Sequence, residues 1–136
     1  MTMPETYCPE CFAMIPADAP VCPACGADVV RLSARDYREK LLHALQHPLA
    51  DVRLRAIIAL GLRGDAGAAD AMAHCALRYP ADVTAALEVI NGLRQFDSGP
   101  RSGAALTLLA EQHPGRAVRA AAQRALEEVA LENRYR

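Results

Sequence analysis

Apolar residues recur every three or four positions from about residue 33 to the end of the chain, with charged residues between them. This spacing places the apolar positions on one face of an α-helix. Prolines separate the apolar stretches, because proline cannot continue the interior of a helix; they are Pro48, Pro80, Pro100 and Pro114. The pattern predicts about six helices, at residues 33–46, 50–63, 66–78, 81–96, 101–112 and 115–132.

The first predicted helix has a candidate start signal. Ser33 is a residue type that caps helix N-termini, because its hydroxyl accepts a hydrogen bond from a free backbone N–H. The apolar stripe that follows comprises Tyr37, Leu41, Leu42 and Leu45. We therefore expect one continuous helix from Ser33.

The first thirty residues show no helical pattern. They hold two C-P-x-C pairs separated by ten residues, and the cysteines are Cys8, Cys11, Cys22 and Cys25. Two tight turns that each place two sulfurs on one side can close a tetrahedron around a metal ion. The few apolar residues here cannot offset the entropy of ordering the backbone, about 1–2 kcal/mol per residue. We expect one structural zinc ion, whose binding supplies about 10–16 kcal/mol in comparable small domains.

The segment CPECFAMIPADAPVCPACGAD, over residues 8–25, also resembles the short zinc ribbons found at the ends of many bacterial proteins. It departs from them at Phe12, where the first turn usually has glycine. Either the backbone after Cys11 is less turned, or Phe12 is an exposed apolar contact. Two other readings remain open: a rubredoxin-like iron centre, and thiol redox chemistry by a single C-x-x-C pair.

The helical part carries an internal repeat. His47-Pro48, Tyr79-Pro80 and His113-Pro114 recur at separations of 32 and 34 residues, and each is followed by a valine near a helix start. We align the valines Val52, Val83 and Val118. Arginine follows the valine in the first and third copies, as Arg53 and Arg119, and Thr84 follows it in the second. Stacked hairpins can bury an apolar stripe that a single hairpin cannot.

The stretch HPLADVRLRAIIALGLRGDAGAADAMAHCAL resembles a HEAT-like repeat of the short, PBS-lyase type. The resemblance implies a mostly α fold: a short HEAT-like α-solenoid over about residues 33–133. It divides the chain into a zinc ribbon at residues 1–30 and a helical repeat domain at 31–136. In such families an arginine at the place of Arg53 and Arg119 bonds acids or carbonyls between repeats, so we expect a structural role for both.

Composition and charge narrow the choice of partner. Aromatic residues make up 4% of the chain and hydrophobic residues 52%, largely alanine, which favours closely packed helices over a sheet. The net charge of −1 hides an asymmetry, because residues 1–30 carry four acids and no Lys or Arg. An acidic ribbon repels phosphates, and no basic residues alternate with aromatics, so a nucleic-acid-binding ribbon is disfavoured.

The remaining cysteine and the histidines offer no catalytic arrangement. Cys75 lies in an apolar stripe between Met72 and Tyr79, and we expect a buried, inert thiol. We expect His74 to be exposed, and we expect capping or solvated roles rather than metal ligation for His43, His47 and His113. The HEAT-like families include a metal-dependent hydroxylase with His-Glu pairs, and this sequence has none.

We therefore expect a protein that is not an enzyme: a zinc-binding adaptor or scaffold that mediates protein–protein interaction through its solenoid. The alternatives are a rubredoxin-like iron redox protein, a nucleic-acid-binding zinc ribbon, and a lyase-like chaperone suggested by family analogy alone. The N-terminus has no signal-peptide pattern and no apolar run is long enough for a membrane span, so we expect a cytoplasmic location. The sequence leaves the partner's identity and the oligomeric state open.

Overall fold

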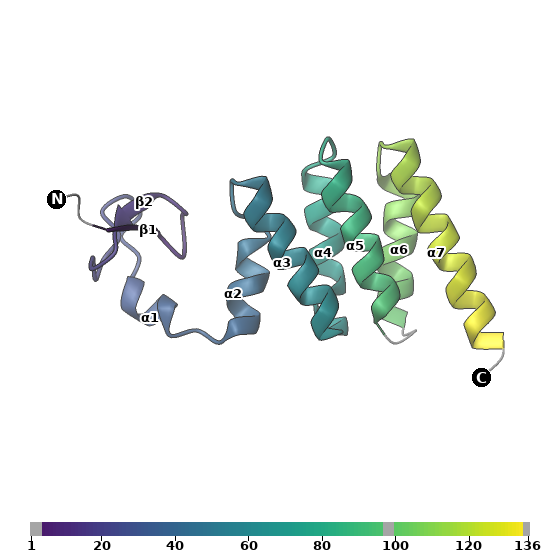
Figure 1. The fold of residues 1–136 in the computed structure, drawn as a ribbon, viewed down its shortest axis with the longest axis horizontal. Helices are drawn as coiled ribbons and strands as arrows, with labels where there is room; N and C mark the ends of the chain where they lie inside the picture. The colour runs from purple at the N-terminus through teal and green to yellow at the C-terminus, as the bar shows by residue number, and fades with distance from the viewer. Residues whose placement is uncertain (1–3, 97–99, 135–136) are drawn as a thin grey trace.

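The computed structural model describes residues 4–96 and 100–134, which form a small strand pair followed by a row of helices (Figure 1). The elements in chain order are β1 (Glu5–Tyr7), β2 (Met14–Pro16), α1 (Val29–Ser33), α2 (Tyr37–Ala44), α3 (Ala50–Arg63), the 3₁₀ turn η1 (Ala66–Ala68), α4 (Ala69–Arg78), α5 (Val83–Gln95), α6 (Pro100–Gln112) and α7 (Arg116–Arg134). The predicted fold class, a short helical solenoid with a small N-terminal cysteine domain, is confirmed.

The N-terminal part has a small core of its own. β1 and β2 pair antiparallel, with Thr6 opposite Ile15. Ile15 is buried together with Cys8, Cys22 and Val29. Because this core holds so few apolar side chains, packing alone does not stabilise it.

The helices form two layers. α3, α5 and α7 lie side by side, and α4 and α6 lie behind them (Figure 1). One apolar core runs through the whole row, and its largest fully buried members include Ile57, Leu60, Met72, Leu93, Leu106, Leu109 and Val118. Each hairpin therefore buries its apolar face against its neighbours.

The start predicted for the first helix is wrong. Ser33 is the last residue of the short helix α1 and caps nothing, while α2 begins at Tyr37. Asp36 is the N-cap of α2, because its carboxylate accepts a hydrogen bond from the Glu39 N–H at 2.8 Å. An aspartate three residues before a glutamate is a capping-box pattern, and it outcompetes a lone serine.

The predicted repeat alignment is also wrong, by two residues in the middle copy. α3, α5 and α7 begin at Ala50, Val83 and Arg116, so the structural period is 33 residues at both steps. In this register Ala85, not Val83, corresponds to Val118. Burial agrees, because Val118 is 0% exposed and Ala85 5%, whereas Val83 is 40% exposed. The residue in place of the repeat arginine is then the buried Ala86 rather than Thr84.

Two glycines let α3 and α5 approach closely. A Cβ added to Gly61 would lie 2.9 Å from the Gly92 Cα, and one added to Gly92 would lie 3.2 Å from the Gly61 Cα. Both contacts are with backbone, which cannot move aside as a side chain can. The crossing of these two helices therefore depends on the missing Cβ atoms.

We expect Gly61→Ala to lower the free energy of unfolding by about 2 kcal/mol, because the two helices must separate. Gly103→Ala is the matched control: Gly103 lies inside α6, and a Cβ there would meet nothing within 4 Å. The control should be neutral or slightly stabilising, because alanine favours helix over glycine. Urea unfolding followed by circular dichroism measures both variants, and equal effects at the two sites would contradict the close-contact account.

Candidate metal centre

The structure brings four cysteine sulfurs together. The Sγ atoms of Cys8, Cys11, Cys22 and Cys25 all lie within 4.8 Å of one another. The Cys8–Cys25 pair is 3.7 Å apart and the Cys11–Cys22 pair 3.8 Å. A disulfide needs about 2.05 Å, whereas a tetrahedron of sulfurs around zinc, with zinc–sulfur bonds of about 2.3 Å, has edges of about 3.8 Å. The four cysteines are therefore positioned to bind one metal ion.

Two matching turns build this cluster. Cys8 O accepts a hydrogen bond from the Phe12 N–H at 3.0 Å, and Cys22 O accepts one from the Gly26 N–H at 2.8 Å. A backbone N–H points at a sulfur in each turn, from Glu10 to Cys8 and from Ala24 to Cys22, both at 3.4 Å. These amides favour thiolate over thiol, as metal ligands require.

Phe12 occupies the place that Gly26 holds in the second turn, and it adopts the same backbone conformation. Its φ is +64°, against +75° for Gly26. The expectation of a less turned backbone after Cys11 is therefore wrong. A bulky residue in the left-handed region carries a strain of about 1–2 kcal/mol, so another interaction must favour phenylalanine here.

The thiols resist ionising together when no cation lies between them. The backbone N–H of Cys25 lowers the pKa of Cys22 to about 7. The pKa of Cys25 itself is raised to about 12, because loss of hydration and the three neighbouring sulfurs outweigh its own hydrogen bond from the Ala27 amide. A divalent cation removes this conflict, because it stabilises all four thiolates at once. The donor set thus suits a metal ion.

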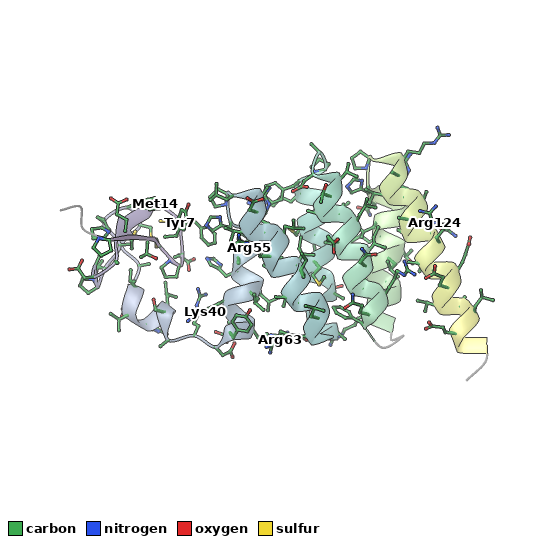
Figure 2. All side chains as sticks on the ribbon, viewed as in Figure 1. Tyr7, Met14, Lys40, Arg55, Arg63 and Arg124 are labelled. Carbon is green, nitrogen blue, oxygen red and sulfur yellow. The ribbon has the colours of Figure 1, made fainter. Side chains whose placement is uncertain are left out.

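The Phe12 ring contacts the helical part, and these contacts offset the strain of its backbone. Its ring stacks on the His43 ring with centroids 4.8 Å apart, and it contacts the His47 ring at 4.6 Å. Tyr7 meets His47 edge to face at 4.7 Å. Side chains fill the space between the strand pair and α2, with Tyr7 on the strand side (Figure 2). The ribbon is thus docked on the end of α2 through an aromatic cluster, Tyr7, Phe12, His43 and His47.

Polar contacts reinforce this junction. His43 Nε2 lies 3.1 Å from the Glu10 carbonyl oxygen, to which it can donate. The Arg35 guanidinium donates to the Pro9 carbonyl oxygen at 3.3 Å. Both carbonyls belong to the turn between the first two cysteines, so the solenoid holds the metal-binding turn itself.

Sequence reasoning missed this role of the histidines. We expected capping or solvated roles for His43 and His47. His47 is only 3% exposed, and its Nδ1 accepts the Leu49 N–H at 3.0 Å at the start of α3, which fits the capping role. The contacts of both rings with the ribbon were not expected. A signal for the junction exists in the repeat register. The residues one 33-residue period before α3 are 17–30, and they hold the second cysteine pair instead of a repeat helix. The ribbon therefore replaces the first helix of a preceding hairpin.

Arg53 and Arg119 have the structural role that the resemblance implied. Their hydrogen bonds go to carbonyl oxygens of their own repeat. Arg53 donates to the carbonyl oxygens of His47 and Pro48 at 2.7 and 3.0 Å. Its guanidinium also lies 3.6 Å from the centroid of the Tyr79 ring, at the end of α4, and it reaches the next hairpin through an ion pair of 3.9 Å with Asp82, the N-cap of α5. Arg119 makes the same two bonds, to His113 and Pro114 at 2.9 and 2.8 Å.

Cys75 and His74 lie where the sequence placed them. Cys75 is buried, its Sγ lies 3.4 Å from the Leu45 carbonyl oxygen, and burial raises the pKa of its thiol. A thiol with a raised pKa is a poor nucleophile. His74 is exposed on α4.

Of the capping and solvated roles expected for His113, the solvated one is wrong, since the residue is 1% exposed, and its hydrogen bond just before α7 fits the capping one. Its Nδ1 accepts the Gly115 N–H at 2.9 Å, and burial lowers its pKa below the ordinary value of 6.5. The unfolded chain takes up this proton at about pH 6.5, and the folded chain only at lower pH. Its contribution to stability is therefore complete above about pH 6.5 and is lost as the pH falls towards the folded pKa.

We expect His113→Asn, which keeps an acceptor near Nδ1, to flatten the loss of stability as the pH falls below about 6.5. Urea unfolding at several pH values measures the slope, and metal release at acid pH cancels in the comparison with the unmodified chain. His74→Asn, an exposed histidine, is the control. Equal slopes for His113→Asn and the unmodified chain would contradict the account.

Along residues 4–96 and 100–134, the helices are too short or too polar for any of them to cross a bilayer.

Comparisons with known proteins agree with the architecture of the helical part. A family model described as HEAT repeats matches residues 38–127, which is most of the chain and runs from the first turn of α2 into α7. No curated protein and no solved structure matches the chain. The match begins in α2 and does not include the four-cysteine segment. On the strength of this match over more than half of its length, the chain belongs to the HEAT-repeat family.

Proposed function

We propose that this protein is a non-catalytic, zinc-binding adaptor, which presents its HEAT-repeat solenoid and its docked ribbon to a protein partner as one surface. The observation that carries the proposal is the aromatic cluster between ribbon and solenoid. A metal site that served only to fold thirty residues would not need Phe12 in a left-handed conformation. The strain is compensated by contacts that fix the ribbon relative to the repeats.

The metal in this proposal is zinc. Four cysteines in a tetrahedron suit zinc, and they also suit a rubredoxin-like iron centre. Metal analysis and a visible spectrum of the purified protein separate the two. One equivalent of zinc and a colourless solution support the proposal, while iron with a charge-transfer band would make redox chemistry the better description.

Nucleic-acid binding is the less favoured alternative. The aromatic rings that a ribbon could offer to bases, Tyr7 and Phe12, contact His43 and His47 instead. The ribbon's acids also oppose phosphate. A gel shift at low salt, with affinity falling over several ions per site, would favour this alternative over the adaptor.

The adaptor role is tested by crosslinking and capture from native lysate, followed by titration of the purified partner into the purified protein. Phe12→Gly is the informative variant, because glycine adopts the turn without strain but loses the contacts with His43 and His47. We expect it to keep one equivalent of metal and to bind the partner more weakly by about tenfold, if the partner spans both parts.

Met14→Gly is the matched control, because Met14 is an exposed apolar residue of the ribbon outside the aromatic cluster. Equal binding by Phe12→Gly and the unmodified chain would show that docking of the ribbon does not serve the partner. If no protein is captured that binds the purified chain again, the adaptor proposal fails as a whole.

A further inference from the structure

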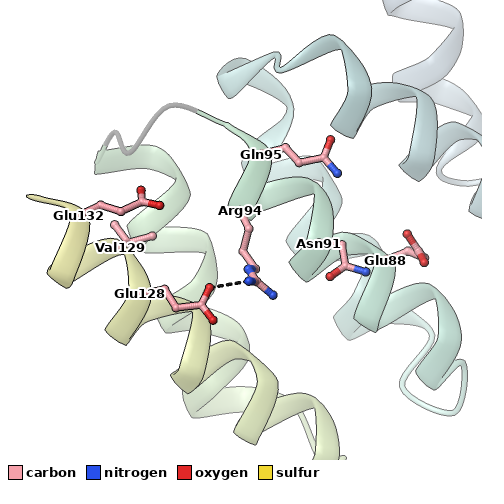
Figure 3. A pocket seen from close by; sticks show the side chains of 7 residues that line it. All are labelled: Glu88, Asn91, Arg94, Gln95, Glu128, Val129 and Glu132. Carbon is pink, nitrogen blue, oxygen red and sulfur yellow. Dashed lines mark ion pairs between the residues drawn. The ribbon is translucent and has the colours of Figure 1, made fainter.

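α5 and α7 lie at the end of the solenoid away from the ribbon domain (Figure 1). Side chains of these two helices line a groove. It consists of two adjoining hollows, of about 470 and about 240 Å³. Both are lined by Asn91, Arg94 and Glu128, so they form one continuous feature. Figure 3 shows the larger hollow, with the Arg94–Glu128 ion pair across it.

The repeat register explains why the groove lies here. With a period of 33 residues, Arg94 of α5 takes the place that Gly61 has in α3, and Ala125 takes the place of Gly92. At the position where Gly61 of α3 contacts Gly92 of α5, the next helix pair therefore has Arg94 on α5 and Ala125 on α7. The long side chain keeps the two helices apart at the surface and reaches Glu128 on α7 instead.

The two hollows differ in chemistry. The larger one is lined by three glutamates, Glu88, Glu128 and Glu132, and by a single base, Arg94. Arg94 is paired with Glu128, and among the side chains that the structure describes no base lies within ion-pair distance of Glu88 or Glu132. The larger hollow thus has uncompensated negative charge.

The smaller hollow has an apolar floor and a polar rim. Leu87, Ile90 and Ala121 line it, with Arg124 on the α7 side. On the α5 side, Asn91 lines both hollows and Gln95 lines the larger one; their exposed amides can pair with the N–H and C=O groups of an extended peptide. Acidic, apolar and amide groups along one groove fit a peptide better than a small molecule.

We propose that this groove binds a basic segment of a partner protein, with lysine or arginine side chains in the hollow of Glu88 and Glu132 and an aliphatic side chain over Leu87 and Ile90. Charge complementarity selects this occupant. An acidic segment would meet three carboxylates, and a purely apolar one would leave the larger hollow unfilled. This inference rests on the proposed adaptor function and names the surface and the kind of partner.

The probe for the test is a fluorescein-labelled peptide with two lysines and one leucine among glycines and serines, titrated into the full metal-loaded chain at low salt. Two further probes replace the lysines by glutamate or the leucine by serine. We expect only the first to bind well, and added salt to weaken it. Amide shifts in an NMR titration should change along α5 and α7.

The decisive variant is Glu88→Gln with Glu132→Gln. We expect its affinity for the lysine probe to fall about fivefold, as for the loss of two exposed ion pairs. Glu111→Gln with Glu127→Gln is the control, because it changes the net charge equally at exposed positions on α6 and α7 that do not line the groove. The control should bind within about twofold of the unmodified chain.

The proposal is overturned if both double variants lose affinity equally, if the glutamate probe binds as well as the lysine probe, if no probe binds, or if the NMR changes fall outside α5 and α7. Its failure is distinct from that of the adaptor function. If a captured partner binds the Glu88→Gln, Glu132→Gln chain with unchanged affinity, the groove is not its binding site, but the adaptor function still stands.

Discussion

Cys22→Ser is expected to abolish stable metal binding and to unfold the ribbon. Cys22 is buried at the centre of the small core, and its sulfur is one of four that meet within 4.8 Å. Three cysteines cannot complete the tetrahedron, and binding of about 10–16 kcal/mol is the main source of stability for a segment of this size. Metal analysis after gel filtration should find well under one equivalent.

The same variant should also affect the repeats, because the ribbon covers the end of the solenoid. Loss of the ribbon exposes His47, whose ring packs against Tyr7 and Phe12. An uncapped solenoid end is less stable, so we expect the thermal transition of the helices to fall by several degrees, as for a loss of about 1–2 kcal/mol.

Cys75→Ala is the control for thiol chemistry in general, because Cys75 is buried in the solenoid and far from the metal site in sequence. It should keep a full equivalent of metal. A Cys22→Ser chain that retains the metal and an ordered ribbon would contradict the assignment of the ligands.

Arg53→Ala is expected to destabilise the solenoid by about 3 kcal/mol, the largest effect that we expect from a single side chain in the repeats. The guanidinium is buried and donates to two carbonyl oxygens, and its loss leaves both without that partner. It also removes the contact with the Tyr79 ring at the end of α4 and the ion pair with Asp82 at the start of the next hairpin. Chemical unfolding followed by circular dichroism measures the change.

Two controls separate the contributions. Arg55 lies on the same helix and is exposed, so Arg55→Ala should change stability by less than about 0.5 kcal/mol. Arg119 makes the same two carbonyl bonds near the end of the chain and is half-buried, so Arg119→Ala should cost less than Arg53→Ala. If Arg53→Ala were as mild as Arg55→Ala, the arginine would not join successive repeats.

The sequence predicted the helical solenoid and the clustering of four cysteines well, because both depend on local patterns. Helical spacing and proline positions define α3 to α7 within a few residues. The C-P-x-C pairs define two turns without reference to the rest of the molecule. The helix at residue 33 failed, because a serine was chosen as the cap where Asp36 and Glu39 form a stronger signal.

What could not be predicted depends on tertiary contacts. Pro80 departs from the constant 33-residue spacing, so an alignment based on the prolines and the valines that follow them placed the middle copy two residues out of register. The burial of the side chains shows the correct register. The left-handed Phe12 is understandable only once His43 and His47 are seen beside it. The groove at Arg94 likewise requires the correct register, because only then does Arg94 coincide with Gly61.

The constant 33-residue period also determines how far apart the two ends of the molecule lie. Every inserted or deleted hairpin would translate the last helices relative to the metal centre by one fixed increment, and would leave each end's local chemistry unchanged. Related chains could therefore change the distance between the four-cysteine end and the end that carries the α5–α7 groove in whole steps, simply by changing the number of hairpins between them.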